Sequence, residues 1–167
     1  TLRGLGHEGG ATNTLWRNGV VWSNRFGVYN ENTGAGPLRF ENSMMGALVS
    51  NQYGFYLQSG VITSDYNNIV LRGGGAAGYR PTTVPWVYYK AADLVAGATQ
   101  DWHSLSHEPL FADEAGQDYH EQTVYPSGRY VGGSGYTATD AATSPLLDAG
   151  TGLYTNEAAL NGNRANI

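Results

Sequence analysis

The sequence predicts an all-β fold in which short strands stack as the successive coils of a solenoid. Two patterns of Asn, Gly and apolar residues recur within residues 18–70, at spacings between 24 and 27. Glycine supplies 24 of the 167 residues, and charged residues are only 14%, against about 25% in typical domains. Short apolar runs separated by Asn and Gly are typical of strands joined by tight turns and argue against helices.

The first pattern is Asn, a small or polar residue and two apolar residues, and it occupies 18–21, 42–45 and 67–70. The second pattern occupies 23–29 and recurs, at an offset of 27, over 50–56. This spacing suits one solenoid coil, whose strand pairs in parallel with its equivalent about 4.8 Å away. It is too short for a propeller blade of about 40–45 residues. A β-sandwich with evenly spaced strands, whose turn signals fall about every 8–12 residues, is the alternative.

The apolar members of the two patterns are expected to fill the interior of the coils. In the first pattern Val20, Met44 and Ile69 are expected to stack above one another. In the second pattern Val28 and Phe55 are expected to do the same. Equivalent positions of parallel strands face the same side of their sheet, so these side chains would form a continuous core.

Asparagine and aspartate are expected to hold the corners between strands. Asn18, Asn42 and Asn67 would stack at one bend, because Asn tolerates left-handed backbone angles and its amide can bond the amide above it. Asp148, in a Ser-Pro-Leu-Leu-Asp-Ala-Gly run, would close a turn on nearby backbone amides. These are structural roles.

The chain is expected to divide into three parts of one domain. Residues 1–72 would form β-helical coils of about 24–27 residues. Residues 73–100, which begin with a glycine-rich stretch, would form an insertion with one short helix over 91–98 that turns Leu94 and Val95 inward. Residues 101–167 would form the terminal coils and an irregular, loop-rich cap. We also expect the chain to be a processed or partial piece of a longer protein.

Six motifs follow one another from residue 63 onward. They are 63–68 (TSDYNN), 99–104 (TQDWHS), 108–113 (EPLFAD), 116–120 (GQDYH), 144–150 (SPLLDAG) and 161–167 (NGNRANI). In this order they resemble the C-terminal portion of secreted bacterial right-handed parallel β-helix proteins, which have a pectate-lyase-like fold and often carry the choice-of-anchor Q surface-protein domain. The chain departs from that pattern at Gln100 and Glu108, and it ends before the "GAYG" that closes the family's last coil.

The resemblance implies a right-handed parallel β-helix that is extracellular or attached to the cell surface. It further implies a non-catalytic structural, adhesion or assembly module, whose partners would be a polysaccharide or neighbouring protein chains, including copies of itself. One alternative is a carbohydrate-active enzyme, a polysaccharide lyase or a glycoside hydrolase, with part of its catalytic residues outside this piece. A carbohydrate-binding module is the other.

Charge and composition exclude several other classes. A net charge of −5 argues against nucleic acid, because binding to phosphates needs a basic surface. No apolar run reaches the roughly 18 residues of a membrane-spanning helix, so we expect no direct insertion into a membrane. The absence of cysteine excludes disulfides and thiolate ligands.

Carboxylates are the only candidate catalytic groups. Hydrolases of this fold set two or three carboxylates close together on successive coils, and Asp101, Asp118 and Asp148 are weak candidates for such a cluster. Capping of turns by the same residues is the favoured interpretation. A lyase base is not evident, because Lys90, the single lysine, falls in the predicted insertion.

No metal or other cofactor is expected. The four histidines, at 7, 103, 107 and 120, would bind a metal only if three of them converged. Calcium at the Asp- and Asn-rich turns is the one possibility that the sequence leaves open, although neither an EF-hand nor a G-G-x-G-x-D repeat is present.

Aromatic side chains are the best candidates for contact with a ligand or partner. Trp86, Tyr88, Tyr89 and Trp102 lie outside the apolar repeats. Exposed aromatic rings offer a large, rigid and flat surface that can stack on a sugar or anchor an interface. The alternative is that 86–89 simply cover one side of the coils.

Overall fold

The protein is described by a computed structural model, in which the all-β prediction is confirmed. The structure describes residues 3–7, 13–31, 37–59, 62–81, 86–90, 92–94, 101–126, 128–132, 135–137, 140–151 and 167. Among these, only 92–94 are helical. No described helix has the length and hydropathy needed to cross a membrane. The chain forms two units, Thr1–Ser106 and His107–Ile167.

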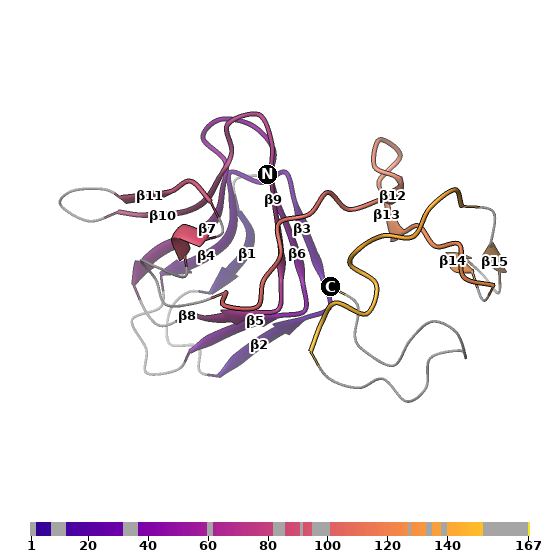
Figure 1. Cartoon of the computed structure of the whole chain (residues 1–167). Coiled ribbons are helices and arrows are strands. Elements are labelled where there is room, and N and C mark those ends of the chain that lie inside the picture. The colour runs from indigo at the N-terminus through magenta and orange to yellow at the C-terminus, as the bar shows by residue number, and fades with distance from the viewer. Residues whose placement is uncertain are drawn as a thin grey trace. The chain divides into compact units, whose positions relative to one another are not determined.

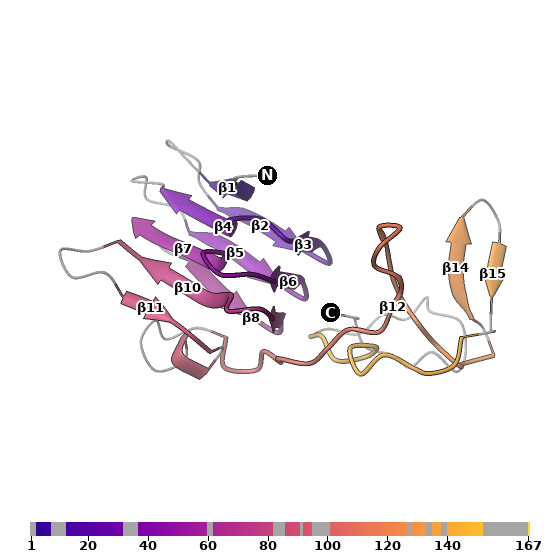
Figure 2. The same ribbon diagram turned by 90° about the horizontal axis from the view of Figure 1, so that it is seen from above.

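Ten strands of the first unit form three parallel sheets, and an eleventh adds an antiparallel edge (Figures 1 and 2). The sheet orders are β1-β4-β7-β10-β11, β2-β5-β8 and β3-β6-β9, so that consecutive strands from β1 to β10 belong to different sheets. The bounds are β1 Arg3–His7, β2 Thr14–Arg17, β3 Val20–Trp22, β4 Phe26–Glu31, β5 Leu38–Glu41, β6 Met44–Ala47, β7 Tyr53–Ser59, β8 Ile62–Asp65, β9 Asn68–Leu71, β10 Ala76–Arg80 and β11 Trp86–Tyr88. β10 falls within the predicted insertion 73–100 and extends the first sheet. The predicted boundaries at 72 and 100 stay predictions.

The register of the sheets follows the spacing of the sequence patterns. In β2-β5-β8 and β3-β6-β9, each residue lies opposite the residue 24 positions later, as in Leu38↔Ile62 and Met44↔Asn68. Between β4 and β7 the step is 27, as in Val28↔Phe55, until an irregularity after Asn30 makes the last pair, Glu31↔Ser59, 28 residues apart. Each group of three strands, β1–β3, β4–β6 or β7–β9, therefore lies as one layer beside the next.

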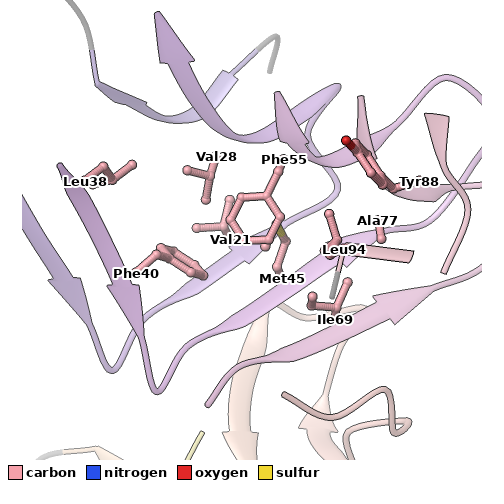
Figure 3. Packing of buried hydrophobic residues seen from close by; sticks show 10 residues of the cluster. All are labelled: Val21, Val28, Leu38, Phe40, Met45, Phe55, Ile69, Ala77, Tyr88 and Leu94. Carbon is pink, nitrogen blue, oxygen red and sulfur yellow. The ribbon is translucent and has the colours of Figure 1, made fainter. Parts of the chain in front are cut away.

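The core fills the space between the three sheets (Figure 3). Val28 and Phe55, both fully buried, face each other across β4 and β7 as predicted. Leu94 is also fully buried in this cluster, as predicted, whereas Val95 lies outside the described residues. The full cluster is Val21, Val28, Leu38, Phe40, Met45, Phe55, Ile69, Ala77, Tyr88 and Leu94.

The predicted column of Val20, Met44 and Ile69 is wrong by one residue. Met44 is buried as predicted, but it lies opposite Val20 and Asn68, whereas the residues that join the core cluster are Val21, Met45 and Ile69. Val20 is 39% exposed. Because side chains alternate between the two faces of a strand, a shift of one residue moves the whole set to the other face.

The predicted corner column of asparagines is also wrong at its last member. Asn18 and Asn42 have left-handed φ values of 56° and 46°, and the Asn18 N–H donates to the carbonyl of Asn42 at 3.0 Å. The residue at the equivalent corner after β8 is Tyr66, with a left-handed φ of 55°, because paired residues of β5 and β8 are 24 positions apart. Asn67 follows it, fully buried.

The glycine at position 54 permits close packing of β7 against β10 and against Met45 of β6. A Cβ on Gly54 would lie 2.6 Å from the carbonyl oxygen of Ala77 and 2.9 Å from Sδ of Met45. Gly54→Ala is therefore expected to lower the free energy of unfolding by about 2 kcal/mol, through overpacking. Urea unfolding measures this effect. Gln58→Ala, an exposed change on the same strand, is the control, and an equal effect of both changes would contradict the packing argument.

The second unit is built from two antiparallel hairpins and a turn-rich segment. β12 (Phe111–Asp113) pairs with β13 (Asp118–Glu121), and β14 (Arg129–Gly132) pairs with β15 (Gly135–Thr137). Leu146 is fully buried, and its carbonyl accepts the backbone N–H of Ile167 at 3.2 Å.

Candidate functional site

The most chemically diverse surface of the first unit is the outer face of the sheet β2-β5-β8. Leu38 and Phe40 of β5 turn into the core, so the alternate residues Arg39 and Glu41 face outward. The register places Arg17, Glu41 and Asp65 opposite one another on the three strands. We call the set Arg17, Arg39, Glu41, Asp65, Trp102 and His103 the charged face.

Two arginines share one carboxylate on this face. Nη2 of Arg17 donates to Oε2 of Glu41 at 2.6 Å, and Nη2 of Arg39 donates to Oε1 of the same group. The arginine side chains are 44% and 51% exposed, whereas that of Glu41 is 11% exposed. Burial acts to raise the pKa of Glu41, but the hydrogen bonds from both arginines outweigh it and hold the pKa below its ordinary value. Glu41 is thus an ionised group at neutral pH.

Asp65 orients a histidine beside this group. Oδ2 of Asp65 lies 2.7 Å from Nδ1 of His103, and its Oδ1 accepts the backbone N–H groups of His103 at 2.7 Å and Tyr66 at 3.0 Å. The ring of His103 stacks on that of Tyr66, with centroids 4.7 Å apart. Among the described residues Nε2 of His103 has no hydrogen-bond partner. An Asp–His pair of this geometry can orient a general base, and it also fastens residues 101–105 to the sheet.

A buried polar network lies behind the Asp–His pair. Oδ1 of Asp101 accepts hydrogen bonds from Oγ of Ser64 at 3.0 Å, Nδ2 of Asn67 at 3.1 Å and Oγ of Ser104 at 2.7 Å. The other oxygen, Oδ2, is buried and has no partner among the described residues. Burial raises the pKa of Asp101. Asp101 is 3% exposed, so this candidate catalytic residue lies inside the network, which favours a structural role.

The other two candidate carboxylates belong to the second unit. Oδ1 of Asp118 contacts Nδ1 of His120, and Nη1 of Arg129 lies 3.4 Å from Oδ2 of Asp118. Hydrogen bonds from His120 hold the pKa of Asp118 below its ordinary value. Asp148 has a left-handed φ of 60° in the turn over 145–148. In the part of the chain that the structure describes, no three His, Asp or Glu side chains come together as a metal site.

The four aromatic candidates have different environments. Tyr88 is 6% exposed and belongs to the core, so it cannot present its ring to a ligand. Tyr89 and Trp102 are 68% and 66% exposed. Trp86 belongs to β11, and its side chain lies outside the described residues. Trp102 directly precedes His103 on the charged face.

Sequence reasoning missed a second group of aromatic rings, on the sheet β1-β4-β7-β10. The rings of Tyr29 and Tyr56 stack with centroids 4.5 Å apart, and Tyr53 lies 5.0 Å from Tyr79. Phe26 contacts Tyr56 at 4.5 Å. Because these rings lie against one another, they contribute to the packing of β4, β7 and β10. The constant offset between the two copies of the second sequence pattern already contained the pairing of Tyr29 with Tyr56.

The charged face itself was also missed. Its column of Arg17, Glu41 and Asp65 has two steps of 24 residues, the spacing between the first two copies of the first sequence pattern, and that spacing was the signal that could have found it. His103 contacts Asp65 across a separation of 38 residues, which matches no repeat in the sequence.

Comparison of the chain with protein-family models, with curated proteins and with solved structures gave no match.

Proposed function

We propose that the first unit is a stretch of a right-handed parallel β-helix, of the kind that the motifs of residues 63–167 resemble. Two observations support this proposal. Successive strands from β1 to β9 are added to the three parallel sheets in rotation. In two of these sheets, paired residues are always 24 positions apart in the sequence. We expect the helix to be right-handed, because connections between parallel strands of one sheet are right-handed in about 98% of cases, as a result of the twist of β-strands.

We further propose that the chain is a non-catalytic extracellular or cell-surface module that binds a polysaccharide on the charged face. The single observation that carries this proposal is Trp102, a 66% exposed indole directly before the oriented pair Asp65–His103. An exposed apolar ring one residue before the oriented His103 suits a sugar, which has one apolar face and hydroxyl groups around its edge.

The electrostatics of the charged face support binding without catalysis. A glycosidase needs one carboxylic acid whose pKa is raised so that it can protonate the leaving group. Glu41 has the opposite property, because two arginines hold it ionised. Asp101, whose pKa is raised, is buried behind the surface.

Affinity electrophoresis through gels that contain single polysaccharides tests the proposal. We expect at least one polysaccharide to retard the chain, and Trp102→Ala to weaken that retardation about tenfold, since aromatic anchors carry much of the binding energy. Tyr89→Ala is the matched control, because Tyr89 is equally exposed on another part of the unit.

The same polysaccharides separate binding from catalysis. We expect no release of reducing sugar or of unsaturated products. Release that disappears with Asp65→Asn would favour a carbohydrate-active enzyme, and no retardation by any polysaccharide would contradict the proposed binding.

A further inference from the structure

The shared carboxylate of Glu41 fixes two guanidinium groups on an open surface. Arg17 and Arg39 each contact a different oxygen of Glu41 through one terminal nitrogen, Nη2. A guanidinium group carries five N–H donors in a planar fork. In the described part of the chain, the other nitrogens of both groups have no hydrogen-bond partner. The side chains are 44% and 51% exposed, so these donors are accessible.

The two arginines and Glu41 together carry a charge of +1 in a chain whose overall charge is −5, and the acidic side chain of Asp65 lies opposite Glu41 on the next strand. An arginine fork matches the two oxygens of a carboxylate or sulfate group, and such bonds are stronger than those between neutral groups. The hydrogen bonds to Glu41 already restrict the conformations of both arginine side chains. A ligand therefore pays less conformational entropy when it binds them.

The surroundings favour a sugar as the carrier of this anion. Leu15, 48% exposed, lies opposite Arg39 on one side, and the exposed Thr63 lies opposite it on the other. The strand of Asp65 is the next beyond Glu41. Leu15 supplies an apolar side chain, and Thr63 supplies a hydroxyl group, on the two strands that flank Arg39. Neighbouring strands are about 4.8 Å apart, so these groups lie close to the charged ones.

We propose that Arg17 and Arg39 bind the anionic group of an acidic saccharide, either a uronic acid carboxylate or a sulfate ester. The proposal rests on the polysaccharide binding proposed above and names its ligand class. Arg17 and Arg39 bind the charge, and the remainder of the charged face contacts the sugar ring.

Titration of the full chain with monosaccharides, followed by NMR of the arginine Nε–Hε signals, tests this assignment. The probes are glucuronate, glucose 6-sulfate, glucose and inorganic sulfate. We expect the two anionic sugars to shift two arginine signals, more weakly at high salt because exposed charges are screened, and glucose to shift neither. Inorganic sulfate that binds as tightly as the sugar sulfate would overturn the saccharide assignment, leaving only an anion site.

Variants locate the site. Arg17→Gln and Arg39→Gln are each expected to weaken binding of glucuronate about tenfold, and Arg39→Lys, which keeps the charge and loses the fork, to weaken it less. Arg25→Gln is the matched control, since the Arg25 guanidinium lies over the Phe26 ring on a different sheet. An equal loss with Arg25→Gln would overturn the proposal, because it would show a general charge effect. Unchanged unfolding temperatures establish that the variants fold.

The two proposals fail in different ways. If a neutral polysaccharide is retained through Trp102 while the arginine variants bind like the native chain, the anionic ligand is wrong and the polysaccharide module stands. If glucuronate binds at the arginines but no polysaccharide is retained, the site for the anion stands and the polysaccharide module is wrong.

Discussion

Asn67→Ala is expected to lower the free energy of unfolding of the first unit by about 3–5 kcal/mol, because it breaks a buried hydrogen-bond network. Asn67 is fully buried, and its Nδ2 donates to the Phe40 carbonyl at 3.0 Å, to Oγ of Ser64 at 2.9 Å and to Oδ1 of Asp101 at 3.1 Å. Its Oδ1 accepts the backbone N–H of Ser43 at 3.0 Å. Alanine leaves several of these groups buried and unsatisfied, each at a cost of about 1–3 kcal/mol.

Urea unfolding of the full chain measures this loss, with Asn24→Ala as the matched control. The amide of Asn24 donates to the carbonyl of Trp22 at 3.0 Å on a partly exposed turn, so its removal is expected to cost about 1 kcal/mol. A second variant, Asn67→Asp, keeps the acceptor for Ser43 but puts another carboxyl group against Asp101. It should also destabilise the unit, increasingly so at high pH. A loss below about 1 kcal/mol with Asn67→Ala would show that the network does not hold the corner together.

Asn67 also shows why the sequence predicts the approximate spacing of paired strands better than their exact alignment. Asparagine tolerates the left-handed conformation of a corner, and it can also be buried where its amide is fully hydrogen-bonded, so its presence does not identify which of the two positions it occupies. The sequence pattern aligned Asn67 with Asn42, a step of 25, whereas hydrogen bonding between adjacent strands keeps a step of 24 and puts Tyr66 at the corner. Periodicity alone cannot decide between steps that differ by one residue, although that one residue reverses the face of every side chain.

The charged face could be predicted only in part. The column Arg17, Glu41 and Asp65 follows from the step of 24 once the strands are known to be parallel and in register. His103 and Trp102 depend instead on the position of residues 101–105, which lie beside 64–68 although 37 positions separate Ser64 from its partner Asp101. The sequence states this separation but not where residues 101–105 lie against the sheet.

Glu121→Gln is expected to stabilise the second unit at pH 8, by up to about 3 kcal/mol. Burial raises the pKa of Glu121 to about 7 from an ordinary value of 4.5, although a hydrogen bond from Oγ of Ser144 at 3.1 Å opposes the shift. Below pH 4.5 the carboxyl group is protonated in both the folded and unfolded states. As the pH rises from 4.5 to 7 the unfolded chain loses the proton first, so the free energy of unfolding falls and then levels off above pH 7. Glutamine never ionises, and it can still accept the hydrogen bond from Ser144.

Urea unfolding at pH 5 and pH 8 compares the two proteins. The gain from Glu121→Gln should be large at pH 8 and small at pH 5, and NMR titration of the Glu121 side chain should give a midpoint near 7. Glu108→Gln, which removes the same charge from an exposed position, controls for the change in net charge. An equal gain at both pH values would assign the effect to packing instead of ionisation. A midpoint near 4.5 would mean that water reaches Glu121, because only a group shielded from water keeps its proton up to neutral pH.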